Sequence, residues 1–150
     1  MLHVALWEPE IPPNTGNIAR LCAATGARLH LIGRLGFRLG DRELKRAGLD
    51  YWPDVEIRRH DSLEAFEASL NGRLLCFSAH ANEPYTRAGF CAGDCLVFGN
   101  ESRGLPASVL ERHAGCVFRI PMPTGKVRSL NLATAVGIVL YEALRQLQNG

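Results

Sequence analysis

Short apolar runs separated by loop residues recur along this chain and predict buried β-strands. These runs cover residues 2–7, 28–32, 55–59, 74–78, 95–98 and 116–120. Segments between them carry helix signals, such as capping residues or a terminal glycine, over residues 17–24, 41–47, 61–70 and 106–113. Strands that alternate with helices favour an α/β fold, a mostly parallel sheet with helices on both faces. No repeat or linker divides the chain, so we expect a single domain over residues 1–150.

The most apolar segment of the chain comes last, over residues 130–147. Its apolar residues fall on nearly every face of a helix, and a helix that is apolar all round is buried on all sides. We therefore expect this helix to be inserted into the domain, packed against a second subunit, or both. Thr134, Gly137 and Glu142 interrupt the segment, which is too short to indicate a membrane span.

The stretch before this helix contains two prolines, Pro121 and Pro123. Proline has no backbone N–H group and continues neither a helix nor a sheet ladder, so residues 121–128 are predicted to form a shaped loop. Either Ser129 or Asn131 can then cap the last helix.

Composition and charge change this picture only slightly. The net charge is +2, which lacks the strongly basic signature of many nucleic-acid-binding proteins. The charge is uneven, however, because six basic residues lie between Arg28 and Arg46 against two acidic ones. The five cysteines form no C-x-x-C pair and lie mostly in apolar runs, which indicates buried thiols in a reducing compartment.

Two further expectations concern metals and location. Cys91, Cys95 and His80 form too weak a grouping to predict a metal site, so we expect no metal. The first residues enter a strand-like run and show no signal-peptide pattern. We therefore expect a cytoplasmic protein with no membrane partner.

Loops rich in glycine, asparagine, serine and proline follow three of the predicted strands, after Ser78, Phe98 and Ile120. Loops at the carboxyl ends of parallel strands meet in a crevice where small ligands bind. The chain has no G-x-G-x-x-G, and T-G-K-V at 124–127 lacks the upstream glycine of a P-loop. The usual nucleotide sites are therefore excluded, and the crevice needs another ligand.

Three ordered motifs identify a resemblance that covers essentially the whole chain. They are N-T-G-N-I-A-R at 14–20, F-G-N-E-S-R-G-L-P at 98–106 and I-P-M-P-T-G-K-V-R-S-L-N-L-A-T-A at 120–135. Their order and spacing resemble the SPOUT methyltransferases, whose C-terminal half forms a trefoil knot. The opening E-P-E-I-P-P-N-T-G-N and the segment R-A-G-L-D-Y at 46–51 resemble, more specifically, the tRNA wobble-position ribose 2′-O-methyltransferases. The resemblance implies S-adenosyl-L-methionine-dependent 2′-O-methylation of nucleotide 34, a cytidine or a modified uridine.

The resemblance also implies how the cofactor binds, bent inside the knot and held mostly by main-chain groups. The residues predicted to bind it are Phe77, Ser78, Gly99, Glu101, Gly104, Ile120, Met122, Ser129, Leu130 and Asn131. Alternatives from the residues alone remain open. Gly99 and Gly104 also suit a plain strand-to-helix turn, and Ser129 and Asn131 suit helix capping. Glu101 can bond a ligand hydroxyl, an asparagine of the first motif, or a surface cation.

The catalytic residues that the resemblance implies are Asn17, Arg20 and Ser129, with Arg20 activating the ribose hydroxyl. Arginine has a pKa above about 12 and hardly ever gives up its proton. Arg20 can instead anchor the adjacent phosphate and orient the hydroxyl, with the phosphate or a water taking the proton. Asn17 and Arg20 lie three residues apart and share a helical face. The alternative is a helix cap followed by a solvated arginine.

The expected macromolecular partners are the tRNA anticodon stem-loop and a second copy of the chain. Basic residues that can follow an RNA backbone are Arg28, Arg34, Arg38, Arg42, Lys45 and Arg46. Tyr51 and Trp52 can stack an unpaired base, or Trp52 can belong to the core. We expect a homodimer with the last helix in its interface and a site to which one subunit donates Arg20. Alternatives are a 2′-O-methyltransferase acting on another tRNA or rRNA site and a non-catalytic RNA-binding relative.

Overall fold

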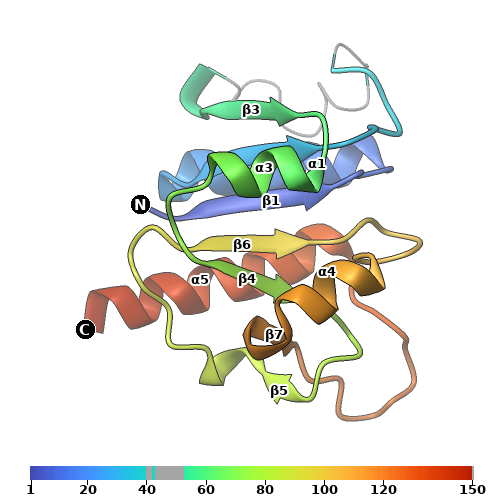
Figure 1. Ribbon diagram of the computed structural model, residues 1–150, viewed down its shortest axis with the longest axis vertical. Coiled ribbons are helices and arrows are strands. Elements are labelled where there is room, and N and C mark those ends of the chain that lie inside the picture. Colours follow the sequence, from blue (N-terminus) through green and yellow to red (C-terminus); the bar gives the residue numbers. More distant parts are fainter. Residues whose placement is uncertain (40–41, 43–52, 150) are drawn as a thin grey trace.

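The computed structural model describes residues 1–39, 42 and 53–149. Within these ranges, seven strands form one sheet in the order β3-β2-β1-β6-β4-β7-β5 (Figure 1). Their bounds are His3–Trp7 (β1), Arg28–Ile32 (β2), Ile57–His60 (β3), Leu74–Phe77 (β4), Glu83–Pro84 (β5), Cys95–Phe98 (β6) and Val117–Arg119 (β7). Every pair of neighbouring strands is parallel. The predicted parallel α/β sheet is confirmed.

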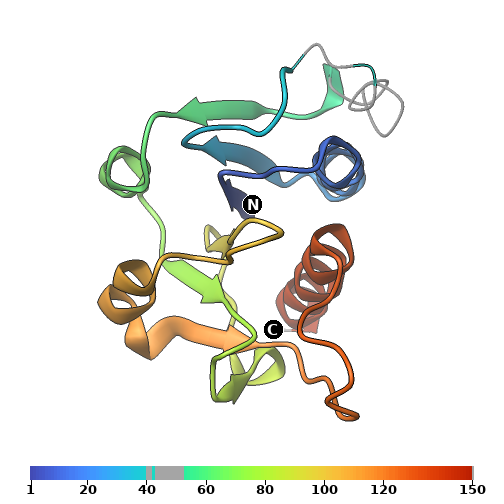
Figure 2. The same cartoon turned by 90° about the vertical axis from the view of Figure 1, so that its right-hand side faces the viewer.

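Helices cover both faces of this sheet. Their bounds are Pro12–Thr25 (α1), Leu63–Ser69 (α3), Ala107–Arg112 (α4) and Leu132–Asn149 (α5), with short 3₁₀ turns at Tyr85–Arg87 and Ala114–Cys116. Figure 2 shows α1 and α5 together on one face of the sheet and α3 and α4 on the other. The trefoil knot predicted for the C-terminal half stays a prediction.

Each face of the sheet has its own hydrophobic core because successive strand residues point to opposite sides. Val4 and Leu6 of β1 belong to the core beneath α1 and α5, whereas Ala5 belongs to the core beneath α3 and α4. All three residues are fully buried. Burial on both sides explains why the strands read as continuous apolar runs and not as alternating ones.

Helix α1 begins earlier than its sequence predicts. The local pattern predicts a cap at Asn17 and an irregular loop over residues 8–14, but the helix starts at Pro12. Proline suits the first helical positions because the N–H that it lacks has no partner there in any case. The side chain of the N-cap residue Ile11 makes no capping bond, and Gly26 ends the helix at φ 79° as predicted. The next N–H groups, those of Asn14 and Thr15, both donate to the Ile11 carbonyl, at 3.1 and 3.4 Å.

The predicted starts of two other helices are also resolved. Ser62, and not Asp61, caps α3, since its hydroxyl accepts from the backbone N–H of Ala65 at 3.1 Å. Asn131, and not Ser129, caps α5, since its Oδ1 accepts from the N–H of Thr134 at 3.1 Å. Residues 121–130 contain no helix or strand, as the two prolines predict.

The single chain buries only part of α5, so insertion into the domain does not by itself account for all of the helix, and packing against a second subunit stays a prediction. Val136, Val139, Leu140 and Ala143 are fully buried, but Tyr141 is 52% exposed. The first four recur at helical spacing and form one stripe against the sheet. Another side of α5 carries its exposed residues, Thr134, Tyr141, Arg145 and Gln148. The helix therefore retains an open face.

Some sequence predictions fall outside the described residues. These are the helix over residues 41–47, except for Arg42, and the roles suggested for Lys45, Arg46, Tyr51 and Trp52. Among the helices that the structure does describe, none has the length and apolarity needed to cross a membrane.

Three histidines form a hydrogen-bonded row across β1, β2 and β3. His30 Nε2 lies 2.9 Å from His3 Nδ1, and His30 Nδ1 lies 2.9 Å from His60 Nε2. The Phe66 ring packs 5.1 Å from the His30 ring and 4.9 Å from the His60 ring. Burial is the main cause that lowers the pKa of all three histidines, and it brings the pKa of His30 to about 4. The folded protein thus keeps His30 neutral where an unfolded chain would bind a proton.

We expect the free energy of unfolding to fall as the pH drops from 6.5 to about 4. In that window the unfolded chain binds a proton at position 30 that the folded chain excludes, which lowers stability by roughly 1–3 kcal/mol. Urea unfolding of the wild type and of His30→Gln across this range isolates the contribution. The free energy of unfolding of His30→Gln should depend less on pH than that of the wild type. His80→Gln, a substitution at an exposed position, should show the pH dependence of the wild type. Equal slopes for the wild type and His30→Gln would contradict the expectation.

Candidate active site

Three neighbouring strands end side by side at the predicted crevice. Phe77 of β4 is the register partner of both Phe98 of β6 and Phe118 of β7. The rings of Phe77 and Phe98 stack at 5.1 Å with an angle of 17° between their planes. The loops that begin at Ser78, Gly99 and Ile120 therefore leave one edge of the sheet, as the sequence predicts. Phe77 itself is buried in the core below them.

The loop after β6 folds back on its own backbone. A Cβ atom on Gly99 would lie only 2.0 Å from the carbonyl carbon of Gly104. The N–H of Gly104 donates to the carbonyl of Asn100 at 3.1 Å, and Gly104 has φ 68°. The turn itself therefore requires glycine at both positions, which supports the strand-to-helix turn. Cofactor contact by these glycines stays a prediction.

Glu101 holds the residues that lead into α1 and the side chain of Asn14 in its first turn. Its Oε1 accepts from the N–H of Glu10 at 2.9 Å, and its Oε2 accepts from the N–H of Ile11 at 2.9 Å and from Asn14 Nδ2 at 3.1 Å. A carboxylate at a helix N-terminus also interacts favourably with the helix dipole. Of the three partners suggested for Glu101, the structure shows the first-motif asparagine.

The third motif joins the same network. Asn131 Nδ2 donates to Asn14 Oδ1 at 3.0 Å, while Asn131 Oδ1 caps α5. Asn14 is only 7% exposed, so its amide is almost removed from water. Hydrogen bonds of a single asparagine thus connect all three sequence motifs.

A second set of contacts fastens the loop after β6 to the loop after β1. Glu10 Oε1 accepts from the Ser102 N–H at 2.9 Å and from the Ser102 hydroxyl at 2.6 Å. These bonds lower the pKa of Glu10. Arg103 pairs with Glu8 at 3.2 Å, and its guanidinium lies 5.0 Å from the centre of a Trp7 ring. Sequence reasoning missed these roles because no local pattern relates residues 92 positions apart.

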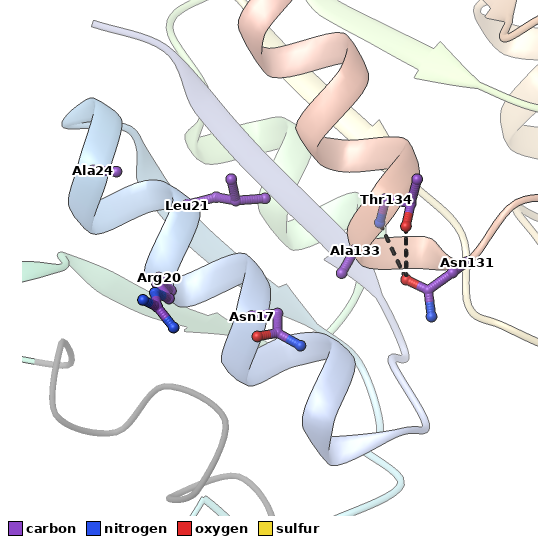
Figure 3. Close-up of a pocket in the computed structure, with 7 residues that line it drawn as sticks. All are labelled: Asn17, Arg20, Leu21, Ala24, Asn131, Ala133 and Thr134. Atoms are coloured by element: carbon purple, nitrogen blue, oxygen red, sulfur yellow. Dashed lines mark hydrogen bonds between the residues drawn. The ribbon is translucent and has the colours of Figure 1, made fainter.

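A pocket of about 440 Å³ lies between α1 and the start of α5 (Figure 3). Its lining residues are Asn17, Arg20, Leu21, Ala24, Asn131, Ala133 and Thr134. Asn17 and Arg20 lie one turn apart on α1 and face the same pocket as Asn131, as their spacing predicts. Asn17 lies inside the helix, so the alternative that it caps the helix is wrong. Two residues of the first motif and three of the third motif therefore line one pocket within a single chain.

The other predicted site residues lie outside this pocket. Ser129 is exposed, and Ile120, Met122 and Leu130 are half-buried. Ser78 is half-buried: its N–H donates to the Phe118 carbonyl at 2.9 Å, and its hydroxyl accepts from the His80 N–H at 3.2 Å. Their roles toward a cofactor, and that of Ser129 in catalysis, stay predictions.

Thiol and metal chemistry find little support in the described part of the chain. No group of three or more histidine, cysteine, aspartate or glutamate side chains there could hold a metal ion. Burial raises the pKa of Cys22 and of Cys76 to about 12, which keeps these thiols protonated near neutral pH.

Comparison with known proteins gives consistent matches. The model of the SpoU rRNA Methylase family matches residues 1–141. A relative from Escherichia coli strain K12, named tRNA (cytidine(34)-2'-O)-methyltransferase, is 49% identical over 149 residues, covering 98% of this chain and 94% of that protein. A relative from Bacillus subtilis with the same name, marked as putative, is also 49% identical over 149 residues, covering 97% of this chain and 92% of that protein.

Solved structures agree with these matches. One described as giving structural insights into the 2-OH methylation of C/U34 on tRNA has a TM-score of 0.95 and 55% identity, covering 100% of this chain and 98% of that chain. The SpoU methyltransferase AviRb from Streptomyces viridochromogenes, in complex with the cofactor AdoMet, has a TM-score of 0.87 and 26% identity. It covers 100% of this chain and 62% of that chain.

Proposed function

This chain belongs to the SpoU rRNA methylase family, and from that premise we propose that it methylates the ribose 2′-hydroxyl of nucleotide 34 in tRNA. The methyl donor is S-adenosyl-L-methionine, and nucleotide 34 is a cytidine or a modified uridine. The observation that carries the proposal is the 49% identity to a relative named for this reaction, over nearly the full length of both chains. One domain of residues 1–150 then suffices for catalysis and for choosing the substrate.

The carboxyl edge of the sheet fits the methyl donor. Gly104 is exposed, and no atom lies within 4 Å of where its Cβ would be, so a ligand can approach the backbone closely. Among the described side chains, the amide nitrogen of Asn100 is buried without a hydrogen-bond partner. Main-chain groups at Ser78, Gly104 and Met122 would hold the donor there. When bound, it supplies an electrophilic methyl group attached to a sulfonium.

The pocket between α1 and α5 then receives the ribose. Arg20 pairs with a phosphate next to nucleotide 34, and Asn17 orients the sugar. The 2′-oxygen gains the methyl carbon as the carbon–sulfur bond breaks, and the hydroxyl proton passes to a phosphate or a water. Arg20 keeps its own protons, because a guanidinium is not deprotonated in proteins. Holding the hydroxyl in line can lower the barrier by roughly 7–11 kcal/mol.

The proposed substrate and setting follow from the same reaction. The catalytic domain itself would read the anticodon stem-loop, and the exposed Arg34 and Arg38 are available for phosphates. The reaction takes place in the cytoplasm. Mapping of ribose methylation in bulk tRNA, with and without the protein in the cell, tests the proposal. Loss of methylation at another tRNA or rRNA nucleotide would favour the related enzyme, and no change would favour an RNA-binding relative.

We also propose that the protein is a homodimer with the open face of α5 in its interface. Tyr141 on this face is 52% exposed, a large aromatic side chain that a partner would cover. Tyr141→Glu should therefore give a folded monomer by light scattering at micromolar concentration, while Arg87→Glu stays dimeric. Substitutions of Val139 or Leu140 are unsuitable, because both residues are fully buried in the chain's own core. A monomeric wild type would contradict the proposal.

Donation of Arg20 from one subunit to the other is a separate part of this proposal. The distance along the chain between the first motif and the cofactor loops does not support it, because the first and third motifs line one pocket. Unfolding and refolding a mixture of the Arg20→Ala and Gly104→Leu proteins still decides whether Arg20 acts across subunits. Activity returns in the mixture only if each site uses residues of both subunits, and silence with proven heterodimers assigns Arg20 to its own subunit.

A further inference from the structure

The hydrogen bonds of Glu101, Asn14 and Asn131 form a continuous relay between two helix starts. The relay begins at the backbone N–H groups of Glu10 and Ile11, which donate to Glu101. It continues from Glu101 to Asn14 and from Asn14 to Asn131, and it ends at the first turn of α5. The links span 87 and 117 residues of sequence, so the relay fixes parts of the chain that share no local structure.

The chemistry of the relay permits one orientation of the Asn14 amide. A carboxylate only accepts hydrogen bonds, so Asn14 must turn its nitrogen toward Glu101 and its oxygen toward Asn131. A flipped amide would place two acceptors together on one side and two donors together on the other. Since Asn14 is 7% exposed, water cannot replace either bond at little cost. The relay therefore has a defined geometry.

This geometry sets the position of the helix face that lines the pocket. Asn14, Asn17 and Arg20 recur at intervals of three residues on α1, so a shift at the first turn moves all three. Asn17 lies across the pocket from Asn131 and Thr134 (Figure 3), and Arg20 lines the same pocket one turn further along α1. The relay residue Asn131 thus links α1 directly to the far wall of the same pocket.

We propose that Glu101 and Asn14 are positioning residues that align Arg20 with the loop leading into α5. This inference rests on the proposed function. It assigns Glu101 a different role from the cofactor contact that the sequence suggests, because both of its carboxylate oxygens already accept bonds from the first motif and the residues before it. The relay couples the cofactor loops to the helix that carries Arg20.

The variant Glu101→Gln tests this role with almost no change in size. A glutamine offers one acceptor oxygen to three donors, so the first turn of α1 loosens. The methylation rate at saturating substrates should fall about 10- to 100-fold, as expected for a misplaced reacting group, with the Kd for S-adenosyl-L-methionine changed less than about threefold. Glu67→Gln is the matched control, since Glu67 also binds two partners, Arg112 and His113, but outside the relay. A parallel loss of cofactor affinity and rate would overturn the proposal.

A second substitution provides a rescue. Asn14→Asp alone would place a second carboxylate beside that of Glu101, where 3.1 Å now separates Asn14 Nδ2 from Glu101 Oε2. Two negative charges at this distance repel each other, so this variant should also methylate more slowly. In the double variant, which combines Glu101→Gln with Asn14→Asp, the new amide can donate to the new carboxylate, and that carboxylate still accepts from Asn131. The double variant should therefore be faster than either single variant. A double variant no better than the slower single one would overturn the relay.

Hydrogen exchange gives a readout that needs no activity. The amides of residues 16–18 in α1 should exchange roughly tenfold faster in Glu101→Gln and regain protection in the double variant. Unchanged exchange in Glu101→Gln would overturn the relay, whatever the enzyme does. A wild type that methylates no tRNA would instead overturn the proposed function, and the exchange experiment would still decide the relay.

Discussion

Replacing Arg20 by alanine is expected to slow methyl transfer by about 100- to 1000-fold while leaving S-adenosyl-L-methionine binding unchanged. Arg20 lines the pocket between α1 and α5, and none of the residues proposed to hold the donor, Ser78, Gly104 and Met122, lines that pocket. Removing one charged group that holds the reacting centre typically costs about 100- to 1000-fold in rate. Single-turnover methylation of tRNA and calorimetry with the donor measure the two quantities separately.

Two further variants sharpen this prediction. Arg20→Lys keeps the charge but loses the planar fork that binds a phosphate through two bonds, so it should recover only part of the rate. Arg87→Ala removes an exposed arginine whose ion pair with Glu83 is long, at 3.7 Å, and it should behave as the wild type. Arg20→Ala with full activity would remove Arg20 from the proposed mechanism.

Replacing Gly99 by alanine is expected to disrupt the loop after β6 and, with it, cofactor binding. The added methyl group would lie 2.0 Å from the Gly104 carbonyl carbon and 2.2 Å from the Leu105 nitrogen, and backbone atoms cannot yield as a flexible side chain can. Overpacking of this kind costs about 1–3 kcal/mol or more. Urea unfolding and calorimetry with the donor should both show the loss.

Gly115→Ala is the matched control, because no atom lies within 4 Å of the added methyl group. It should retain stability and cofactor binding. Normal stability and normal binding in Gly99→Ala would show that the loop has another arrangement in solution.

The sequence predicts the sheet and the location of the crevice well because both depend on local patterns. Runs such as residues 95–98 are apolar at every position, and only a strand buried on both faces needs that composition. Once such strands are parallel, the loops after Ser78 and Phe98 must leave the same edge. The registers of β4, β6 and β7 confirm this expectation.

The start of α1 could not be predicted because the bonds that hold it come from a distant residue. Pro12 and Pro13 favour a loop when read locally, although proline also suits the first helical positions, where it leaves no N–H group without a partner. Glu101 accepts from the N–H of the N-cap residue Ile11 from 90 positions away. The motif N-E-S-R-G shows that Glu101 is available, but nothing in it indicates which donors the carboxylate accepts.

The open face of α5 was missed for a different reason. A count of apolar residues does not show that Thr134, Tyr141, Arg145 and Gln148 are the exposed residues of the helix, whereas the stripe that includes Val136 and Leu140 is buried in the chain's own core. The pattern therefore indicates that α5 has more apolar surface than a solvated helix needs. It does not indicate which residues contact the chain's own core and which remain open to a partner.

The most direct test of the central claim is methyl transfer by the purified protein to an anticodon stem-loop RNA whose nucleotide 34 has lost its 2′-hydroxyl. With labelled S-adenosyl-L-methionine, the unmodified RNA should accept a methyl group on the ribose of nucleotide 34. The RNA with 2′-deoxy nucleotide 34 should accept none, although it still binds. Equal labelling of both RNAs, or label at another nucleotide, would contradict the account.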